Sequence, residues 1–140
     1  CQTHLKVNEN AESYPAFRAS YQLSSDSAEE KEFKIKRISF DFENGECLLA
    51  LYNGENSQPL SVVRFAEKEW VENTKPFWEA GAFYRAVCYG EWNHEEFAAC
   101  IWHYETPLNT KLKFTFSEER KQLVLQVTAQ QEMTFNYVRI

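Results

Sequence analysis

The chain has 140 residues, of which 44% are hydrophobic and 16% aromatic, and its formal net charge is −6. This length is typical of one domain that buries a sizeable core. The acidic balance argues against nucleic acid as a partner, because binding the phosphate backbone requires a basic surface. Since no stretch approaches the roughly 18 apolar residues of a membrane-spanning helix, we expect no membrane span.

The first half of the chain predicts a polar arm followed by a meander of strands. Residues 1–18 are polar and mixed, which is typical of a linker or flexible arm, and we expect the folded domain over residues 19–140. Asn44 and Gly45 are the strongest short-range signal for a hairpin turn, and the strand after them is apolar on both faces. Alternating apolar residues predict strands over Ala19–Leu23, Phe33–Phe42, Glu46–Tyr52 and Pro59–Phe65.

The alternation breaks at Ala66–Glu72, which we expect to form one helical turn or an irregular crossing, and Asn73–Trp78 is predicted as a loop. A long aromatic hairpin follows, with its turn in the polar stretch Glu91–Glu95. The two arms of this hairpin and the last three strands are predicted over Phe83–Gly90, Phe97–Glu105, Thr110–Phe116, Leu123–Thr128 and Met133–Ile140.

Eight or nine antiparallel strands joined mostly by short turns predict an all-β fold. Both arms of the long hairpin carry bulky side chains on both faces, so we expect both faces to be covered. The expected architecture is a single antiparallel β-barrel of about eight strands, with a β-sandwich as the alternative. A barrel of this size holds either a core of side chains or one ligand.

The four cysteines, Cys1, Cys47, Cys88 and Cys100, show no metal-binding spacing. Cys88 and Cys100 are equidistant from His94, so in a regular hairpin they face each other and permit a cross-strand disulfide in an oxidising compartment. The alternative is that both are small buried hydrophobic residues. Cys1 stands first in the sequence, which is also the position of the lipid-anchored cysteine in a mature bacterial lipoprotein. A boundary within a longer protein would give the same first residue.

The sequence contains no motif for a nucleophilic serine, neither GxSxG nor SxxK. His103 and Glu105 share one face of a predicted strand, which makes them a candidate acid–base or metal-ligand pair. A histidine at the barrel rim beside a surface carboxylate explains the same spacing. Because metal binding needs a third ligand that the sequence does not place, we expect no metal, no cofactor and no catalytic centre in this chain.

Aromatic residues form the second candidate site. Tryptophans and tyrosines in the long hairpin and in the connections before it are suited to lining a pocket for an apolar or sugar-like ligand. The alternatives are that they form the core of an aromatic-rich barrel, or that those in connections pack on a neighbouring domain. The residues concerned are Trp70, Trp78, Tyr84, Tyr89, Trp92, Trp102 and Tyr104.

Part of the chain resembles a known family. The run Gly90-Glu91-Trp92, the strand ending in Tyr104-Glu105-Thr106-Pro107 and the alternating strand Lys111–Phe116 are similar to a G-x-W…(Y/F)-E-T-P run followed by an L-x-F-x-F strand. That pattern belongs to the C-terminal β-domain of bacterial β-lactamase-related serine hydrolases, the class C-like penicillin-binding proteins and esterases.

The likeness extends upstream to the strand Ile38–Phe42 and the loop from Trp70 to Thr74, and so covers Tyr21–Val127. The resemblance implies a lipocalin-like or calycin-like barrel that follows a catalytic domain. Because the family's nucleophile and general base belong to the upstream domain, the resemblance implies no catalytic residue here. The residues that match the family motif are Gly90, Trp92, Glu105, Thr106 and Pro107.

Three hypotheses follow. The first is a bacterial, extracytoplasmic accessory domain, in the periplasm or at the cell surface, that packs on a serine hydrolase domain or shapes access to its active site. It predicts an apolar patch on one side of the barrel. The second is a free-standing lipoprotein that binds a small apolar ligand, which predicts an open, dry cavity in the barrel. The third is an enzyme with a cysteine within hydrogen-bond reach of His103.

Overall fold

The computed structural model describes residues 6–24, 35–54, 58–74, 85–103, 109–128 and 132–140. All regular structure in these ranges is β-strand, and no helix long and apolar enough to cross a membrane occurs in them. The ten strands are β1 (Phe17–Leu23), β2 (Arg37–Glu43), β3 (Glu46–Tyr52), β4 (Ser61–Ala66), β5 (Val71–Thr74), β6 (Arg85–Asn93), β7 (Glu96–His103), β8 (Asn109–Ser117), β9 (Gln122–Thr128) and β10 (Glu132–Arg139).

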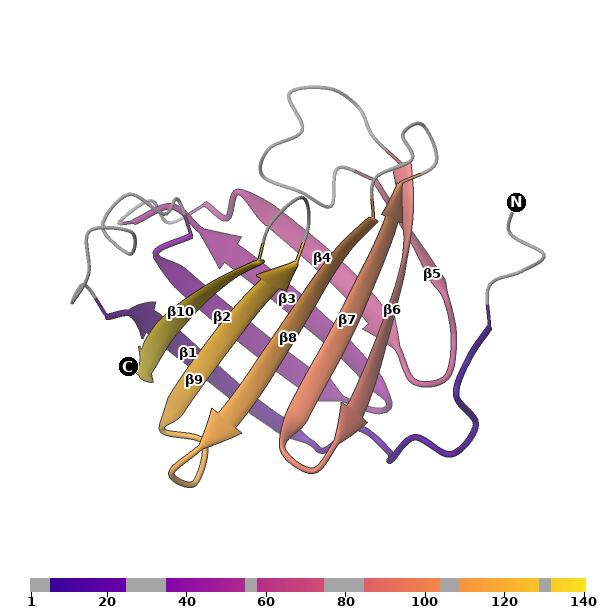
Figure 1. The fold of residues 1–140 in the computed structure, drawn as a ribbon, viewed down its shortest axis with the longest axis horizontal. Helices are drawn as coiled ribbons and strands as arrows, with labels where there is room; N and C mark the ends of the chain where they lie inside the picture. The colour runs from indigo at the N-terminus through magenta and orange to yellow at the C-terminus, as the bar shows by residue number, and fades with distance from the viewer. Residues whose placement is uncertain (1–5, 25–34, 55–57, 75–84, 104–108, 129–131) are drawn as a thin grey trace.

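The strands form one antiparallel sheet in the order β4-β3-β2-β1-β10-β9-β8-β7-β6-β5. Its two end strands, β4 and β5, are consecutive in the chain, so the sheet curls round until its ends approach each other (Figure 1). The result is a nearly closed up-and-down barrel. The prediction of an all-β barrel is confirmed, and the single continuous sheet differs from the two packed sheets of a sandwich.

The expected count of about eight strands is wrong, because the described residues contain ten. The unexpected strand is β5, which lies where the sequence predicted an irregular crossing and a loop. β5 has only four residues, and of its two inward side chains, Val71 and Asn73, one is polar. Apolar alternation over so short a strand is too brief to recognise in a sequence.

The predicted turn at Asn44 and Gly45 is confirmed. These two residues alone separate β2 from β3, with φ of 54° and 76°. Positive φ at both positions is the conformation of a type I′ turn, which Asn-Gly adopts readily. The return strand β3 occupies the predicted residues, Glu46–Tyr52.

The long hairpin turns later than the sequence predicted. β6 continues to Asn93 and β7 begins at Glu96, so His94 and Glu95 form a two-residue turn with φ of 50° and 62°. The centre of the hairpin therefore falls between His94 and Glu95 rather than on His94. This register decides which side chains of β6 and β7 share a face.

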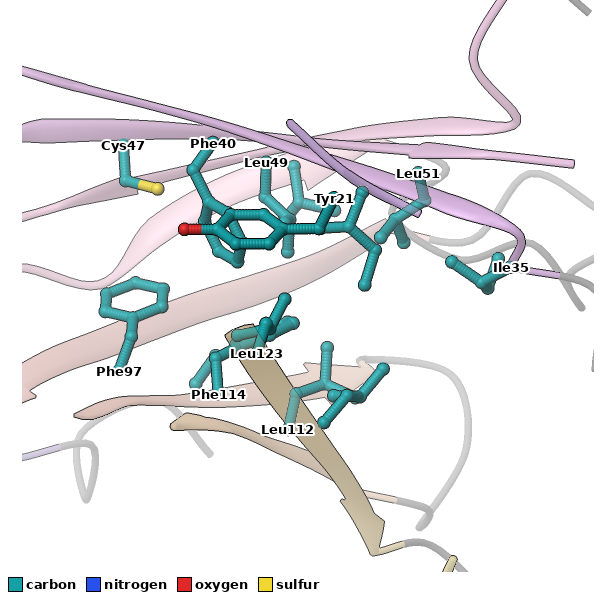
Figure 2. Packing of buried hydrophobic residues seen from close by; sticks show 14 of the residues in the cluster. Tyr21, Ile35, Phe40, Cys47, Leu49, Leu51, Phe97, Leu112, Phe114 and Leu123 are labelled. Atoms are coloured by element: carbon teal, nitrogen blue, oxygen red, sulfur yellow. The ribbon is translucent and has the colours of Figure 1, made fainter. Parts of the chain in front are cut away.

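Inward side chains from opposite walls meet inside the barrel. The ring of Phe40 on β2 lies 5.0 Å from that of Phe114 on β8, and Phe42 lies 5.3 Å from Phe97 on β7, both measured between centroids. Figure 2 shows Phe40 and Leu49 pointing from one wall toward Phe114 of the other. At this level the interior is therefore filled by side chains, with aromatic rings in edge contact.

The N-terminal arm, residues 6–16, is attached to the barrel. It runs beside β5 and passes the end of the barrel that carries the turns after β4 and β6, before β1 begins at Phe17 (Figure 1). Tyr14 from this arm enters the core, where its ring lies 5.7 Å from Phe42 and 5.6 Å from Phe97. Because β1 starts at Phe17, the domain boundary predicted at residue 18 falls inside the first strand.

Candidate functional site

The structure separates the predicted aromatic site into an inner and an outer part. Trp92 on β6 points inward, is 4% exposed, and lies 5.4 Å from the rings of both Phe42 and Phe116. It is therefore a core residue, as the alternative interpretation held. Three of the other predicted aromatics, Trp78, Tyr84 and Tyr104, lie outside the described residues.

Trp70 and Tyr89 form a stacked pair on the outer side of the wall, with ring centroids 5.1 Å apart. The N-terminal arm binds both of them. Trp70 Nε1 donates to the carbonyl of Lys6 at 2.9 Å, and the backbone N–H of Asn8 donates to the Tyr89 hydroxyl at 2.7 Å. Tyr89 is buried as a consequence, so this pair holds the arm in place.

Trp102 lies on the outer face of β7, where it is 37% exposed and faces Val87 of β6 across the ladder. The interpretation of Trp102 as a core residue is therefore wrong, because the register of the hairpin directs it outward. Trp92 inside the wall and Trp102 outside it do not line a common pocket.

The disulfide that the sequence permitted between Cys88 and Cys100 is not formed. Cys88 faces Ile101 and Cys100 faces Tyr89 in the β6–β7 ladder. Since successive residues of a strand point to opposite faces, the two thiols lie on opposite sides of the wall, and both are free. Cys88 is fully buried, as the alternative interpretation held, and burial raises the pKa of its thiol to about 12.

His103 ends β7 and is partly buried, which lowers its pKa. Its predicted partner Glu105 lies outside the described residues together with Thr106 and Pro107, so that pair stays a prediction.

The Cys88 thiol is protonated at neutral pH, whereas a nucleophilic cysteine requires the thiolate. Within the described ranges, no group of three or more His, Cys, Asp or Glu is arranged to hold a metal ion.

Gly90, a residue of the family-like motif, has a packing role in this structure. A Cβ atom at this position would overlap the ring of Phe97, lying 2.7 Å from its Cε1, and would lie 3.2 Å from Cδ1 of Phe65. The carbonyl of Gly90 also accepts a hydrogen bond from the Tyr14 hydroxyl at 2.5 Å. Glycine is therefore required where two rings cover the inner face of β6.

An ion pair links two turns at one end of the barrel, and no sequence motif indicates it. Arg120 donates through Nε and Nη2 to the two carboxylate oxygens of Glu95, each at 2.8 Å, which lowers the pKa of Glu95. The guanidinium lies 4.3 Å from the centre of the Phe17 ring. An open pocket of about 400 Å³ adjoins the pair and is lined by Glu95, Phe116, Ser117, Glu118, Glu119 and Arg120.

Aliphatic side chains gather on the outer face of β3 and β4 and on the residue just before β4, and we call Leu48, Ala50, Leu60 and Val62 the β3–β4 patch. Val62 faces Ala50 across the ladder, and Leu48 lies diagonally from Val62. Leu48, Leu60 and Val62 are 44%, 43% and 46% exposed. The sequence signal for this patch was the return strand Glu46–Tyr52, which is apolar on both faces. In the structure one of these two faces is in contact with water.

No protein-family model matches the chain, and no curated protein matches it.

Proposed function

We propose that this barrel is a non-catalytic accessory domain that packs on a serine hydrolase domain through the β3–β4 patch. The observation that carries the proposal is the patch itself. Three of the six exposed large hydrophobic residues of the described chain, Leu48, Leu60 and Val62, gather there. Because Leu48 and Val62 are diagonal neighbours on adjacent strands and Leu60 directly precedes β4, they are not scattered and form a surface suited to a protein partner.

The nature of the partner rests on the family resemblance. Gly90-Glu91-Trp92 and Tyr104-Glu105-Thr106-Pro107 are similar to the C-terminal β-domain of β-lactamase-related serine hydrolases. Under this proposal the barrel is of the lipocalin-like type, lies in the periplasm or at the bacterial cell surface, and leaves the hydrolytic reaction to its partner. Its task is to hold that partner or to shape access to its active site.

A ligand carrier is the less favoured reading of the same barrel. It requires an open cavity, and the Phe40 and Phe114 rings from opposite walls are 5.0 Å apart. A small apolar ligand at this level would have to displace packed rings. The core therefore favours docking on the outer surface over binding inside.

Photo-crosslinking in cells of the source organism tests the proposal. Benzoylphenylalanine replaces Val62 in the β3–β4 patch, and in a matched control it replaces Thr134, an exposed residue on β10. After irradiation, a fluorophosphonate probe labels active serine hydrolases. We expect the Val62 variant to give an adduct that carries the probe, because the partner domain covers this position.

The Thr134 variant is expected to give no labelled adduct, since β10 lies away from the patch in the sheet order. Two results would overturn the proposal. One is the absence of any adduct at Val62, and the other is an adduct that does not react with fluorophosphonate while free hydrolases in the same cells do. The second result would show a partner of another class.

A further inference from the structure

The β3–β4 patch has a positively charged border. Arg64 on β4 lies directly opposite Leu48 of β3 and two positions from Val62, on the same outward face. It is exposed to solvent. Because the Cβ atoms of directly opposite residues lie about 4.5–5.5 Å apart in an antiparallel pair, the side chain of Arg64 stands at the edge of the apolar surface.

The guanidinium of Arg64 has no carboxylate partner. No ion pair between described residues includes it, not even with Glu46, the exposed carboxylate diagonal to it on β3. Asp41, which flanks Leu48 on the other side, is bound by Arg18 at 3.4 Å. Of the two charges that flank Leu48 in its row of the sheet, the carboxylate is therefore paired and the guanidinium is not.

A second arginine stands at the other end of the patch. Arg37 on β2 lies opposite Tyr52 of β3, and its guanidinium carbon is 4.0 Å from the centre of the Tyr52 ring. Tyr52 follows Ala50 of the patch by two positions and so shares its outward face. The apolar surface therefore lies between two arginines, in a chain whose net charge is −6.

Arginines at the border of an apolar surface favour a partner that carries carboxylates at the matching places. A guanidinium binds a carboxylate through two parallel hydrogen bonds. A partner without an acidic group there would take water away from Arg64 and give nothing in return, and a basic group would repel it. The border of the patch is thus complementary to an acidic surface.

We infer that the hydrolase domain presents an acidic surface to the β3–β4 patch, with one of its carboxylates bound to Arg64. This inference rests on the proposed function and adds the charge that the partner carries. Apolar side chains of the partner cover Leu48 and Val62, while the carboxylate pairs with the guanidinium beside them. Arg64 thereby helps to select the partner and to fix its orientation on the barrel.

Zero-length crosslinking detects the carboxylate directly. Arg64→Lys keeps the positive charge and supplies an amine, which a water-soluble carbodiimide couples to a carboxylate in contact with it. An extract of the source organism that contains this variant is treated with the fluorophosphonate probe and then with the carbodiimide. We expect a probe-labelled adduct, and mass spectrometry should find the introduced lysine joined by an amide bond to an Asp or Glu of the hydrolase.

The same variant contains its own control. Lys111 is an exposed lysine on β8, in the opposite wall of the barrel (Figure 1), where it faces Cys100. We expect no probe-labelled adduct through Lys111, because the inference places the partner on the other wall. Coupling to the hydrolase through both lysines equally would show that the amide bonds arise from random collisions, and would overturn the inference.

Charge reversal tests the pair without a chemical coupling. In the protein that carries benzoylphenylalanine in place of Val62, Arg64→Glu sets one carboxylate against another, so we expect about tenfold less probe-labelled adduct. Lys111→Glu is the matched control, since it changes the net charge by the same amount on an exposed strand residue. It should leave the yield of adduct unchanged.

The results separate this inference from the docking proposal. A labelled adduct at Val62 that Arg64→Glu does not weaken would overturn the acidic surface and leave the docking proposal standing. Equal losses from Arg64→Glu and Lys111→Glu would show an effect of net charge alone and would also overturn the pair at Arg64. Absence of a labelled adduct at Val62 in the otherwise unaltered chain would overturn both proposals.

Discussion

At the scale of single residues, Gly90 is fixed by the rings that cover it. We predict that Gly90→Ala lowers the free energy of unfolding by about 1–3 kcal/mol, the usual result of adding a methyl group to a filled core. The cause is the overlap between the new Cβ and the ring of Phe97. Urea unfolding followed by tryptophan fluorescence measures the change.

The control for this prediction is a double-variant cycle with Phe97→Leu, which replaces the ring by a smaller side chain. If the ring is the obstacle, Gly90→Ala costs clearly less in the Phe97→Leu background than in the native one. Strictly additive losses would contradict the explanation and would assign the need for glycine at position 90 to its backbone.

At the scale of elements, the turn between β8 and β9 is strained. Glu118, Glu119 and Arg120 all have positive φ, at 53°, 56° and 67°, and this conformation costs roughly 1–2 kcal/mol for a residue other than glycine. We predict that Glu119→Gly raises the free energy of unfolding by about 0.5–1 kcal/mol, because relief of this strain exceeds the greater flexibility of glycine in the unfolded chain. Thermal and urea unfolding measure the gain.

Thr134→Gly on the exposed face of β10 provides the comparison, since an extended backbone gives glycine no such advantage. We expect this variant to be destabilised by about 0.5–1 kcal/mol. Loss of stability of the same size in both variants would mean that the left-handed turn carries little strain.

The strands that the sequence predicted well are those in which alternation and turn chemistry agree. β3 follows an Asn-Gly turn and matches its prediction at both ends, Glu46 and Tyr52. β5 was missed because only Val71 and Asn73 point inward and one of them is polar. The hydrogen bonds from Asn73 to the backbone of Arg64 were therefore not foreseen either, since they join strands that meet only after the barrel has closed.

The candidate site was predicted less well than the fold, and the register of one hairpin explains much of the difference. A turn centred on His94 would have placed Cys88 opposite Cys100, whereas the two-residue turn at His94 and Glu95 places Tyr89 there. Because side chains alternate with a period of two, this small shift puts the two thiols on opposite faces. The same register turns Trp102 outward while Trp92 stays inside.

At the scale of the whole molecule, four of the described turns lie together at one end of the barrel. They are the turns after β2, β4, β6 and β8, and the N-terminal arm bonds two of them, through Tyr14 to Glu67 and through Glu12 to His94. Tyr14 from the arm enters between Phe42 and Phe97 and bonds the carbonyl of Gly90. The arm thus completes the core. The sequence does not indicate this, because residues 1–18 are polar and mixed.

Burial of ionisable groups in this core predicts that the barrel is labile in alkali. Burial raises the pKa of Cys47 and Cys88 above the ordinary value of 9.0, to about 12 for Cys88, and raises that of Tyr14 above 10.0. Each group is neutral when protonated, so its contribution to stability is complete below its ordinary pKa. Above that value the unfolded chain loses the proton first, and the folded state becomes progressively less favoured.

We therefore expect the free energy of unfolding to be steady near neutrality and to fall from about pH 9 upward, by as much as about 1.4 kcal/mol per pH unit for each group that stays protonated in the fold. Urea unfolding at intervals from pH 7 to pH 11 measures this slope. Cys88→Ala removes one of the groups, so its curve should be shallower between pH 9 and pH 11 even if the variant is less stable throughout. Parallel curves for the two proteins would contradict the account, because they would mean that Cys88 ionises as readily inside the barrel as in the unfolded chain.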